Sequence, residues 1–127
     1  MNDPRQPGRR SAERRGRRAE LVAMLWLMAK GYRILGRRCR TPFGEVDLAA
    51  LKSGVLAIVE VKARASEIAG QDALSPRQQE RLGAAALALA KRWRLERAPI
   101  RYDLMVVGAG SLLPVHRRGV WGADRPF

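Results

Sequence analysis

The chain has 127 residues, 46% of them hydrophobic, which is enough for one ordinary core and too short for two comfortable domains. Its formal net charge is +13, and residues 1–40 contribute +9 of it, from twelve Lys and Arg against Asp3, Glu13 and Glu20. Such a basic surface attracts polyanions, so nucleic acid, DNA above all, is the expected partner, and an anionic membrane surface is the alternative.

The use of cysteine and histidine restricts the metal chemistry. Cys39 is the only cysteine and His116 the only histidine, so an intramolecular disulfide and the usual Cys/His zinc sites are excluded. We therefore expect a cytoplasmic protein, and any bound metal should have oxygen ligands.

The first residues predict a flexible basic arm. Residues 1–15 are rich in Arg, Pro, Gly and Ser and show no apolar period, so a single domain is expected over 16–127. The arm could contact DNA or could only increase solubility. The candidate nucleic-acid-binding residues near its end are Arg14, Arg15, Arg17 and Arg18.

A first helix is predicted over residues 16–30, where good helix formers dominate. Its apolar stripe contains Ala23, Met24, Leu27 and Met28, and Glu20 shares that stripe. Glu20 should therefore face the sheet, and a carboxylate in that position needs a partner or a metal.

The apolar run at 21–29, after a basic start, imitates a secretory signal. Lys30, Gly31 and Tyr32 follow it in place of a small-x-small cleavage site. The run is also shorter than the ~20 residues that a membrane span needs. We expect neither a signal peptide nor a membrane helix.

Three strands should follow, over 32–40, 45–51 and 55–62, separated by a turn at 41–44 and a second turn after Lys52. The third is an almost continuous apolar run, which is typical of a central strand covered on both faces.

The second of these strands alternates. Val46, Leu48 and Ala50 should lie on one face, with Glu45 and Asp47 on the other.

The remainder predicts a loop over 63–74, a helix over 75–95 and strands over 100–107 and 112–120. Ser75 is the expected N-cap of that helix, with a proline at its first position. The order α-β-β-β-α-β-β indicates an α/β fold.

A candidate site follows from the hairpin between the second and third strands. A two-residue loop pairs Lys52 with Val55 and places Asp47 opposite Glu60, and a symmetric four-residue loop gives the same register. Opposed residues have Cβ atoms ~5 Å apart, and Lys62 shares the face of Glu60. Two carboxylates and an ammonium therefore converge.

Two carboxylates at such a short distance repel each other and favour a cation between them. Mg²⁺, with Mn²⁺ as the alternative, would suit ligands from Asp47, Glu60 and Glu20 and could bring water and phosphate together. Lys62 could then orient or deprotonate the attacking water. Taken alone, a Glu-x-Lys pair is also common on solvated sheet edges.

The motifs resemble the YraN-type family of the restriction-endonuclease-like superfamily. The matching segments are Gly16 to Glu20, Gly44-Glu45-Val46-Asp47-Leu48, Val59-Glu60-Val61-Lys62-Ala63-Arg64 and Arg101-Tyr102-Asp103. The resemblance implies a central mixed sheet flanked by helices, similar to Holliday-junction resolvases, with Glu20, Asp47 and Glu60 as metal ligands. It implies that Lys62 is the catalytic lysine.

The expected activity is that of a Mg²⁺-dependent endonuclease on DNA, including branched or structured DNA. Because resolvase-like nucleases often act as dimers, a homodimer is a further expectation from the resemblance. The alternatives are a nucleic-acid-binding module without catalysis and a protein-interaction factor that retains the fold.

The second helix departs from the family pattern at Gln78, where a basic residue is common. Phosphate contact should therefore move to Arg77 and Arg81. Arg64, just after the Glu-x-Lys pair, is another candidate contact.

Arg101 and Asp103 share a strand face, and an ion pair is the simpler expectation for them. Trp26 and Trp93 are expected in the core. Trp121, close to two arginines, is a candidate for base stacking.

Overall fold

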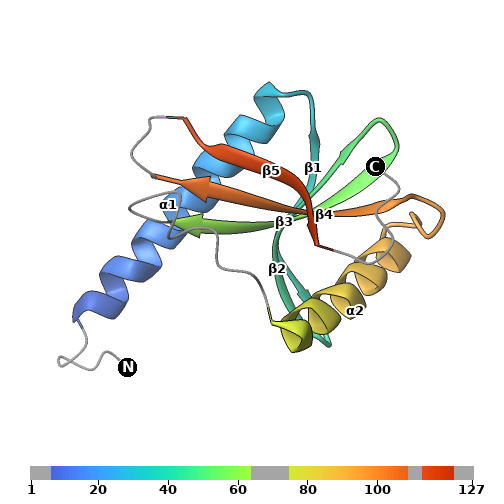
Figure 1. Ribbon diagram of the computed structural model, residues 1–127, viewed down its shortest axis with the longest axis horizontal. Helices are drawn as coiled ribbons and strands as arrows, with labels where there is room; N and C mark the ends of the chain where they lie inside the picture. Colours follow the sequence, from blue (N-terminus) through green and yellow to red (C-terminus); the bar gives the residue numbers. More distant parts are fainter. Residues whose placement is uncertain (1–6, 64–74, 109–112, 122–127) are drawn as a thin grey trace.

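The computed structural model describes residues 7–63, 75–108 and 113–121 (Figure 1). The elements are α1 (Pro7–Ala29), β1 (Arg33–Thr41), β2 (Gly44–Lys52), β3 (Val55–Ala63), α2 (Pro76–Arg92), β4 (Ile100–Val107) and β5 (Val115–Trp121). Their order confirms the predicted α/β arrangement.

All five strands form one mixed sheet in the order β1-β2-β3-β4-β5. β3 and β4 are parallel, and the other three neighbouring pairs are antiparallel. The parallel pair requires a crossover connection, and α2 lies within it.

The two helices cover opposite faces of the sheet (Figure 1). On one face, Leu82 and Leu89 of α2 belong to a buried cluster that contains Ile58. On the other face, Leu27 of α1 belongs to a cluster that contains Val59. β3 thus contributes to both cores, and its residues 56–59 are fully buried, as its apolar run predicted.

The hairpin between β2 and β3 has the predicted register. Lys52 pairs with Val55, and the ladder runs to Leu48 opposite Val59. The loop residues Ser53 and Gly54 have φ angles of 52° and 77°, as a tight two-residue hairpin turn requires.

The expected alternation of β2 fails at its start. Leu48 and Ala50 pack in the α1-side cluster, but Val46 packs in the α2-side cluster. Opposite this point Arg38 of β1 has a φ of 50°, and the paired residues skip from Arg37 to Cys39. This local irregularity reverses the face of Val46 and separates Asp47 from the regular ladder.

α1 begins at Pro7, before the predicted start at Gly16, so helical backbone continues into the predicted arm. Proline suits a first helical position because it lacks an N–H group. Residues 1–6 of the predicted arm lie outside the described residues.

The buried stripe of α1 also differs from the prediction. Ala19, Ala23 and Leu27 are buried at intervals of four residues, whereas Met28 is 52% exposed. A helix turns by about 100° per residue, so the residue after each buried position lies at the margin of the stripe. Glu20 is one of these marginal residues.

α2 begins with a capping box. The Ser75 side chain accepts a hydrogen bond from the Gln78 backbone N–H at 3.2 Å, and the Gln78 side chain accepts from the Ser75 N–H at 2.9 Å. Gln78 therefore caps its own helix, which accounts for a neutral residue there. The helix ends at Arg92, three residues before the predicted end.

The boundaries of the outer strands shift slightly. β1 starts one residue after the prediction, and β5 covers Val115–Trp121 in place of 112–120. The predicted loop over 63–74 and the turn after Gly108 fall mostly outside the described residues, although Ala63 is the last residue of β3.

Candidate active site

Asp47 and Glu60 come together where the β2–β3 ladder ends. The last regular pair is Leu48 with Val59, and the next position brings Asp47 to Glu60. Asp47 Oδ2 accepts a hydrogen bond from the Val61 backbone N–H at 2.9 Å. The Asp47 carboxylate thus lies against β3 and interacts with the Glu60 side chain.

The two carboxyl groups influence each other strongly. Burial and, after it, the charge of the nearby Asp47 together raise the pKa of Glu60 to about 7, against the opposing charges of Lys62 and Arg81. Burial also raises the pKa of Asp47, although the Val61 N–H opposes this shift. This is the electrostatic pattern of a buried acidic pair that lacks sufficient counter-charge.

Glu60 Oε1 is a buried oxygen with no hydrogen-bond partner within the described part of the chain. Leaving a buried carboxylate oxygen unpaired costs free energy, and native structures contain few such atoms. The charge of Lys62 reaches both carboxyl groups, but it does not offset their burial. An additional cation would satisfy both the unpaired oxygen and the repulsion.

Glu20 lies close to this pair but is held by another residue. Arg38 Nε donates to Glu20 Oε1 at 2.8 Å, and the Glu20 side chain is 16% exposed. The charge of Glu20 also raises the pKa of Asp47, so the two carboxylates are within electrostatic range. Glu20 therefore lies at the margin of the buried stripe of α1, within electrostatic range of Asp47.

The structure does not bring the three carboxylates into one ligand set. Among the described residues, no group of three or more His, Cys, Asp or Glu side chains is arranged to hold a metal ion. Asp47 and Glu60 form the close pair, while Glu20 is engaged with Arg38. Its role as a metal ligand stays a prediction.

Sequence reasoning missed Arg38. Its cationic group forms an ion pair with Glu20 and interacts electrostatically with Glu45 and then with Asp47. No sequence pattern marks it, because its position depends on a positive φ within a strand.

Arg81 of α2 approaches the pair from the other side of the sheet. Its charge lowers the pKa of Glu60, and its Nη1 donates to the Phe43 carbonyl at 3.2 Å. Gly44, the first residue of β2, has a φ of 118°, and a Cβ there would collide with the Arg81 guanidinium. The glycine of the Gly-Glu-Val-Asp segment thus provides room for Arg81.

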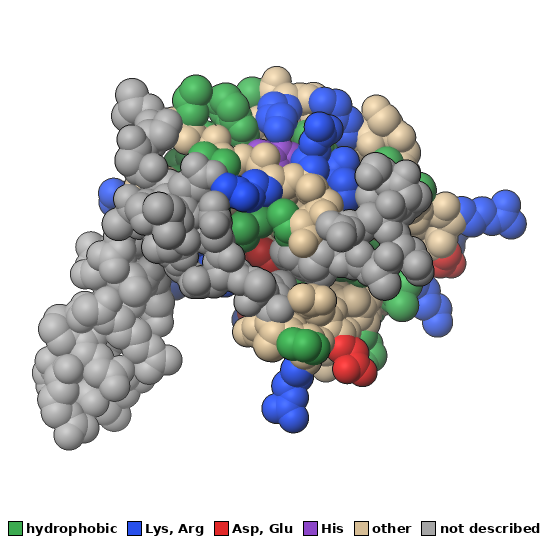
Figure 2. Space-filling model, in the orientation of Figure 1, with side chains coloured by type: hydrophobic (Ala, Val, Ile, Leu, Met, Phe, Trp, Pro, Cys, Tyr) green, Lys and Arg blue, Asp and Glu red, His purple; other side chains and the backbone are tan. Residues whose placement is uncertain are grey.

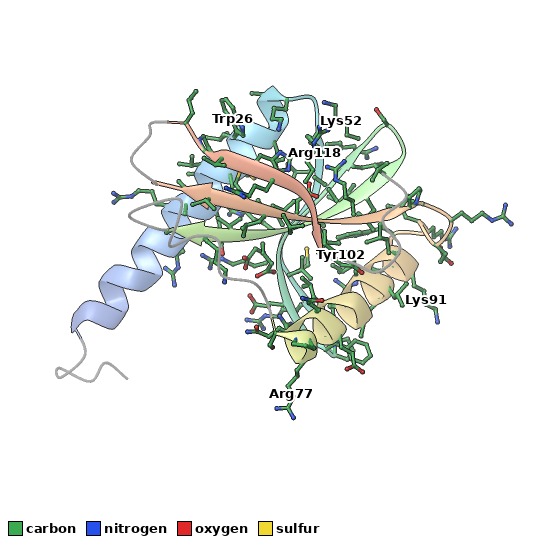
Figure 3. All side chains as sticks on the ribbon, in the orientation of Figure 1. Trp26, Lys52, Arg77, Lys91, Tyr102 and Arg118 are labelled. Carbon is green, nitrogen blue, oxygen red and sulfur yellow. The ribbon has the colours of Figure 1, made fainter. Side chains whose placement is uncertain are left out.

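The predicted nucleic-acid contacts are distributed over both helices. Arg17 and Arg18 of α1 and Arg77 at the start of α2 are exposed, and Figure 3 shows Arg77 extending away from the helix. Arg64 lies outside the described residues, as do the side chains of Arg14 and Arg15.

Arg101 and Asp103 form the expected ion pair. Two guanidinium nitrogens, Nε and Nη2, each donate to one Asp103 oxygen at 2.8 Å, and Asp103 is fully buried. Trp93 and Trp26 are partly buried against the two core clusters, which agrees with the expected core position. The side chain of Trp121 lies outside the described ones.

No helix in the described ranges is long and apolar enough to cross a membrane.

The sequence matches Uncharacterised protein family UPF0102 over residues 19–107. A UPF0102 protein of Maricaulis maris is 48% identical over 114 residues, which cover 89% of this chain and 89% of that protein. A UPF0102 protein of Caulobacter vibrioides is 50% identical over 113 residues, covering 88% and 90%. One of Agrobacterium fabrum is 50% identical over 100 residues, covering 78% and 82%. The chain therefore belongs to the UPF0102 family, which is the YraN-type family that its motifs resemble.

Proposed function

We propose that this protein is a Mg²⁺-dependent nuclease that hydrolyses phosphodiester bonds in DNA, including branched or structured DNA. Glu60 supports this most directly: a buried carboxylate with an unpaired oxygen, adjacent to a second carboxylate and a lysine. A purely structural acidic pair would be expected to have matching donors. The negative charge of this pair is not fully compensated by its neighbours, so the pair could bind a divalent cation.

The chemistry of these side chains suits magnesium. Asp47 and Glu60 would be its ligands, and backbone carbonyl and water oxygens commonly complete such sites. A bound Mg²⁺ would stabilise the negative charge that develops during phosphodiester hydrolysis.

The remaining groups have roles that need no metal. Lys62, one of the cations acting on both carboxyl groups, would orient the attacking water or accept its proton. Arg81 is exposed and would neutralise a phosphate held beside Glu60.

The charge distribution favours a polyanionic substrate. Arg17 and Arg18 lie on α1 close in sequence to Glu20, and Arg77 lies one turn of α2 before Arg81. Both helices therefore present arginines near the acidic pair, as a bound phosphate backbone requires.

The test is cleavage of labelled linear, flap, single-stranded and four-way-junction DNA with Mg²⁺ or Mn²⁺. Wild type would be compared with Glu60→Gln and Lys62→Ala, and Glu45→Gln provides a matched control. Glu45 is also a β2 carboxylate, two residues from Asp47, but its side chain is 52% exposed. We expect wild type and the control to cut, and both site variants to lose at least about 100-fold in rate.

Three results would contradict the proposal. Equal cutting by all four proteins would indicate a contaminating nuclease. Salt-sensitive DNA binding without cutting would identify a non-catalytic binding module, and binding without any preference among the DNA structures would favour a protein-interaction factor.

A further inference from the structure

A second group of polar side chains lies on the α1 face of the sheet. Lys30 Nζ is 2.6 Å from His116 Nδ1, and His116 Nε2 is 2.8 Å from Asp103 Oδ2. The His116 side chain is 2% exposed and that of Asp103 is 0% exposed, whereas Lys30 is only partly buried. Of these three linked side chains, only Lys30 is accessible to solvent.

The contacts of Asp103 determine where the hydrogens lie on these three linked side chains. Asp103 accepts from Arg101, from His116 and from the Gly119 backbone N–H. Burial raises the pKa of Asp103, but the hydrogen bonds from His116 and Arg101 outweigh it, and the net shift is downward. As a carboxylate, Asp103 requires a hydrogen on His116 Nε2, which leaves Nδ1 to accept a proton from Lys30.

Cations surround Lys30. Burial lowers the pKa of its amine, and the charges of Arg118 on β5 and Lys52 on β2 lower it further. Lys52 is fixed in place, donating to the Lys30 carbonyl at 2.6 Å and lying 5.2 Å from the centre of the Tyr32 ring. Lys52 and Arg118 lie at the same end of the molecule, where Lys and Arg side chains gather (Figures 2 and 3).

The choice of lysine at position 30 is informative. Lysine provides only four of the 25 basic residues, at 30, 52, 62 and 91, and arginine provides the other 21. An arginine could supply the same charge, but it cannot lose its proton in a protein. Lys30 therefore has a reactivity that the arginines lack, and it shares this property only with Lys52, Lys62 and Lys91.

This group is separate from the acidic pair. Lys52 lies beside the hairpin turn opposite Val55, five residues before Glu60 along β3. Asp103 itself lies opposite Val59, the residue before Glu60, but it shares the α1 face with Met105, whereas Glu60 alternates with Val59 and faces the α2 side.

We propose that Lys30 is a nucleophilic amine, activated through His116 and Asp103, that forms an imine with a phosphate-bearing aldehyde. The Lys30 amine gives a proton to His116 Nδ1 and its nitrogen bonds to the aldehyde carbon. The carbonyl oxygen takes one proton from this nitrogen and a second from the imidazolium, and it leaves as water when the carbon–oxygen bond breaks and the C=N bond forms. This inference does not depend on the nuclease proposal, because it uses none of the same residues.

The surrounding cations specify the phosphate. The charges of Lys52 and Arg118 both act on the Lys30 amine, so these two cations suit an anionic group on the same substrate. Asp103, the acid of this group, is buried and engaged with Arg101 and His116. His116 is a positioning residue, since it acts on the substrate only through Lys30.

The experiment uses pyridoxal 5′-phosphate, a phosphorylated aldehyde, with the full chain. Borohydride reduces the imine, and mass spectrometry measures the labelling rate of each lysine between pH 5 and 9. Lys91, exposed in the last turn of α2, is the internal control. We expect Lys30 to be labelled at least about tenfold faster than Lys91 at pH 7, because positioned bases contribute about 10²- to 10⁴-fold.

Variants and a second probe separate the contributions. His116→Gln should slow labelling of Lys30 and move its pH profile upward, and Lys91→Arg should leave the Lys30 rate unchanged. Pyridoxal, which lacks the phosphate, should react more slowly at Lys30 but not at Lys91. Equal labelling of the two lysines in wild type, or an unchanged rate and pH profile in His116→Gln, would overturn the proposal. The comparison of the Lys30 and Lys91 labelling rates in the wild type tests the proposal even if the His116→Gln variant does not fold.

Discussion

At the residue scale, the cost of burying Glu60 is the central physical fact of the candidate active site. Its pKa of about 7 lies above the ordinary value of 4.5, so the folded protein binds the Glu60 proton more tightly than the unfolded chain does. The unpaired Oε1 and the adjacent Asp47 both contribute to an environment unfavourable to the anion. A site that holds an anion at such a cost is typical of function and not of stability.

Glu60→Gln should stabilise the metal-free protein at neutral and alkaline pH. The free energy of unfolding of the wild type should be greatest below pH 4.5, fall as the pH rises to about 7, and then level off with respect to this group. The variant should lack this fall and be more stable by on the order of 2 kcal/mol at pH 8. Chemical denaturation at pH 5 and pH 8 measures both values, and a variant less stable than wild type at pH 8 would contradict the assignment.

Arg38→Gln should increase the affinity of the site for Mg²⁺. The change removes a cation that pairs with Glu20 and acts on Asp47, so more uncompensated negative charge faces the site. The Arg38 side chain is 43% exposed, so the free energy of unfolding should change by less than about 1 kcal/mol. Calorimetric titration with Mg²⁺ measures the affinity, and Glu20→Gln in the same chain should cancel the gain. If Arg38→Gln bound Mg²⁺ with unchanged affinity, this would show that Glu20 does not act on the metal site.

At the element scale, α2 connects two parallel strands and depends on its capping box. Ser75 and Gln78 satisfy each other's backbone N–H groups, and Pro76 removes a third donor from the first turn. The start of α2 also positions Arg77 and Arg81.

Ser75→Ala should destabilise the protein by about 1 kcal/mol, because the Gln78 N–H loses its acceptor. Ser75→Thr retains the hydroxyl and should restore most of that stability. Thermal unfolding of the three proteins provides the comparison, and equal melting temperatures for Ala and Ser would show that the cap contributes nothing.

Local patterns were sufficient to predict most elements and the hairpin register. The apolar run of β3 and the Ser53-Gly54 turn determine that register, which brings Asp47 to Glu60. Contacts that depend on an irregular backbone were beyond reach: the positive φ of Arg38 accompanies its contact with Glu20 and the reversal of Val46. The hydrogen bond from Lys30 to His116 joins residues 86 positions apart, and no periodicity predicts it.

At the scale of the whole molecule, two chemically different groups of side chains lie on opposite faces of the sheet. The acidic pair lies where the β2–β3 ladder ends, and Lys30 lies beside Lys52 near the hairpin turn. The sheet between them is covered by a helix on each face, which keeps the two groups in fixed positions. A net charge of +13 would draw one polyanionic partner to both.

The most direct test of the central claim is the effect of Mg²⁺ on thermal unfolding of wild type, Glu60→Gln and Glu45→Gln. A ligand that binds the folded state raises the melting temperature. We predict a rise with increasing Mg²⁺ in wild type and Glu45→Gln, and none in Glu60→Gln. Equal rises in all three proteins, or no rise in wild type, would contradict a metal site at Asp47 and Glu60.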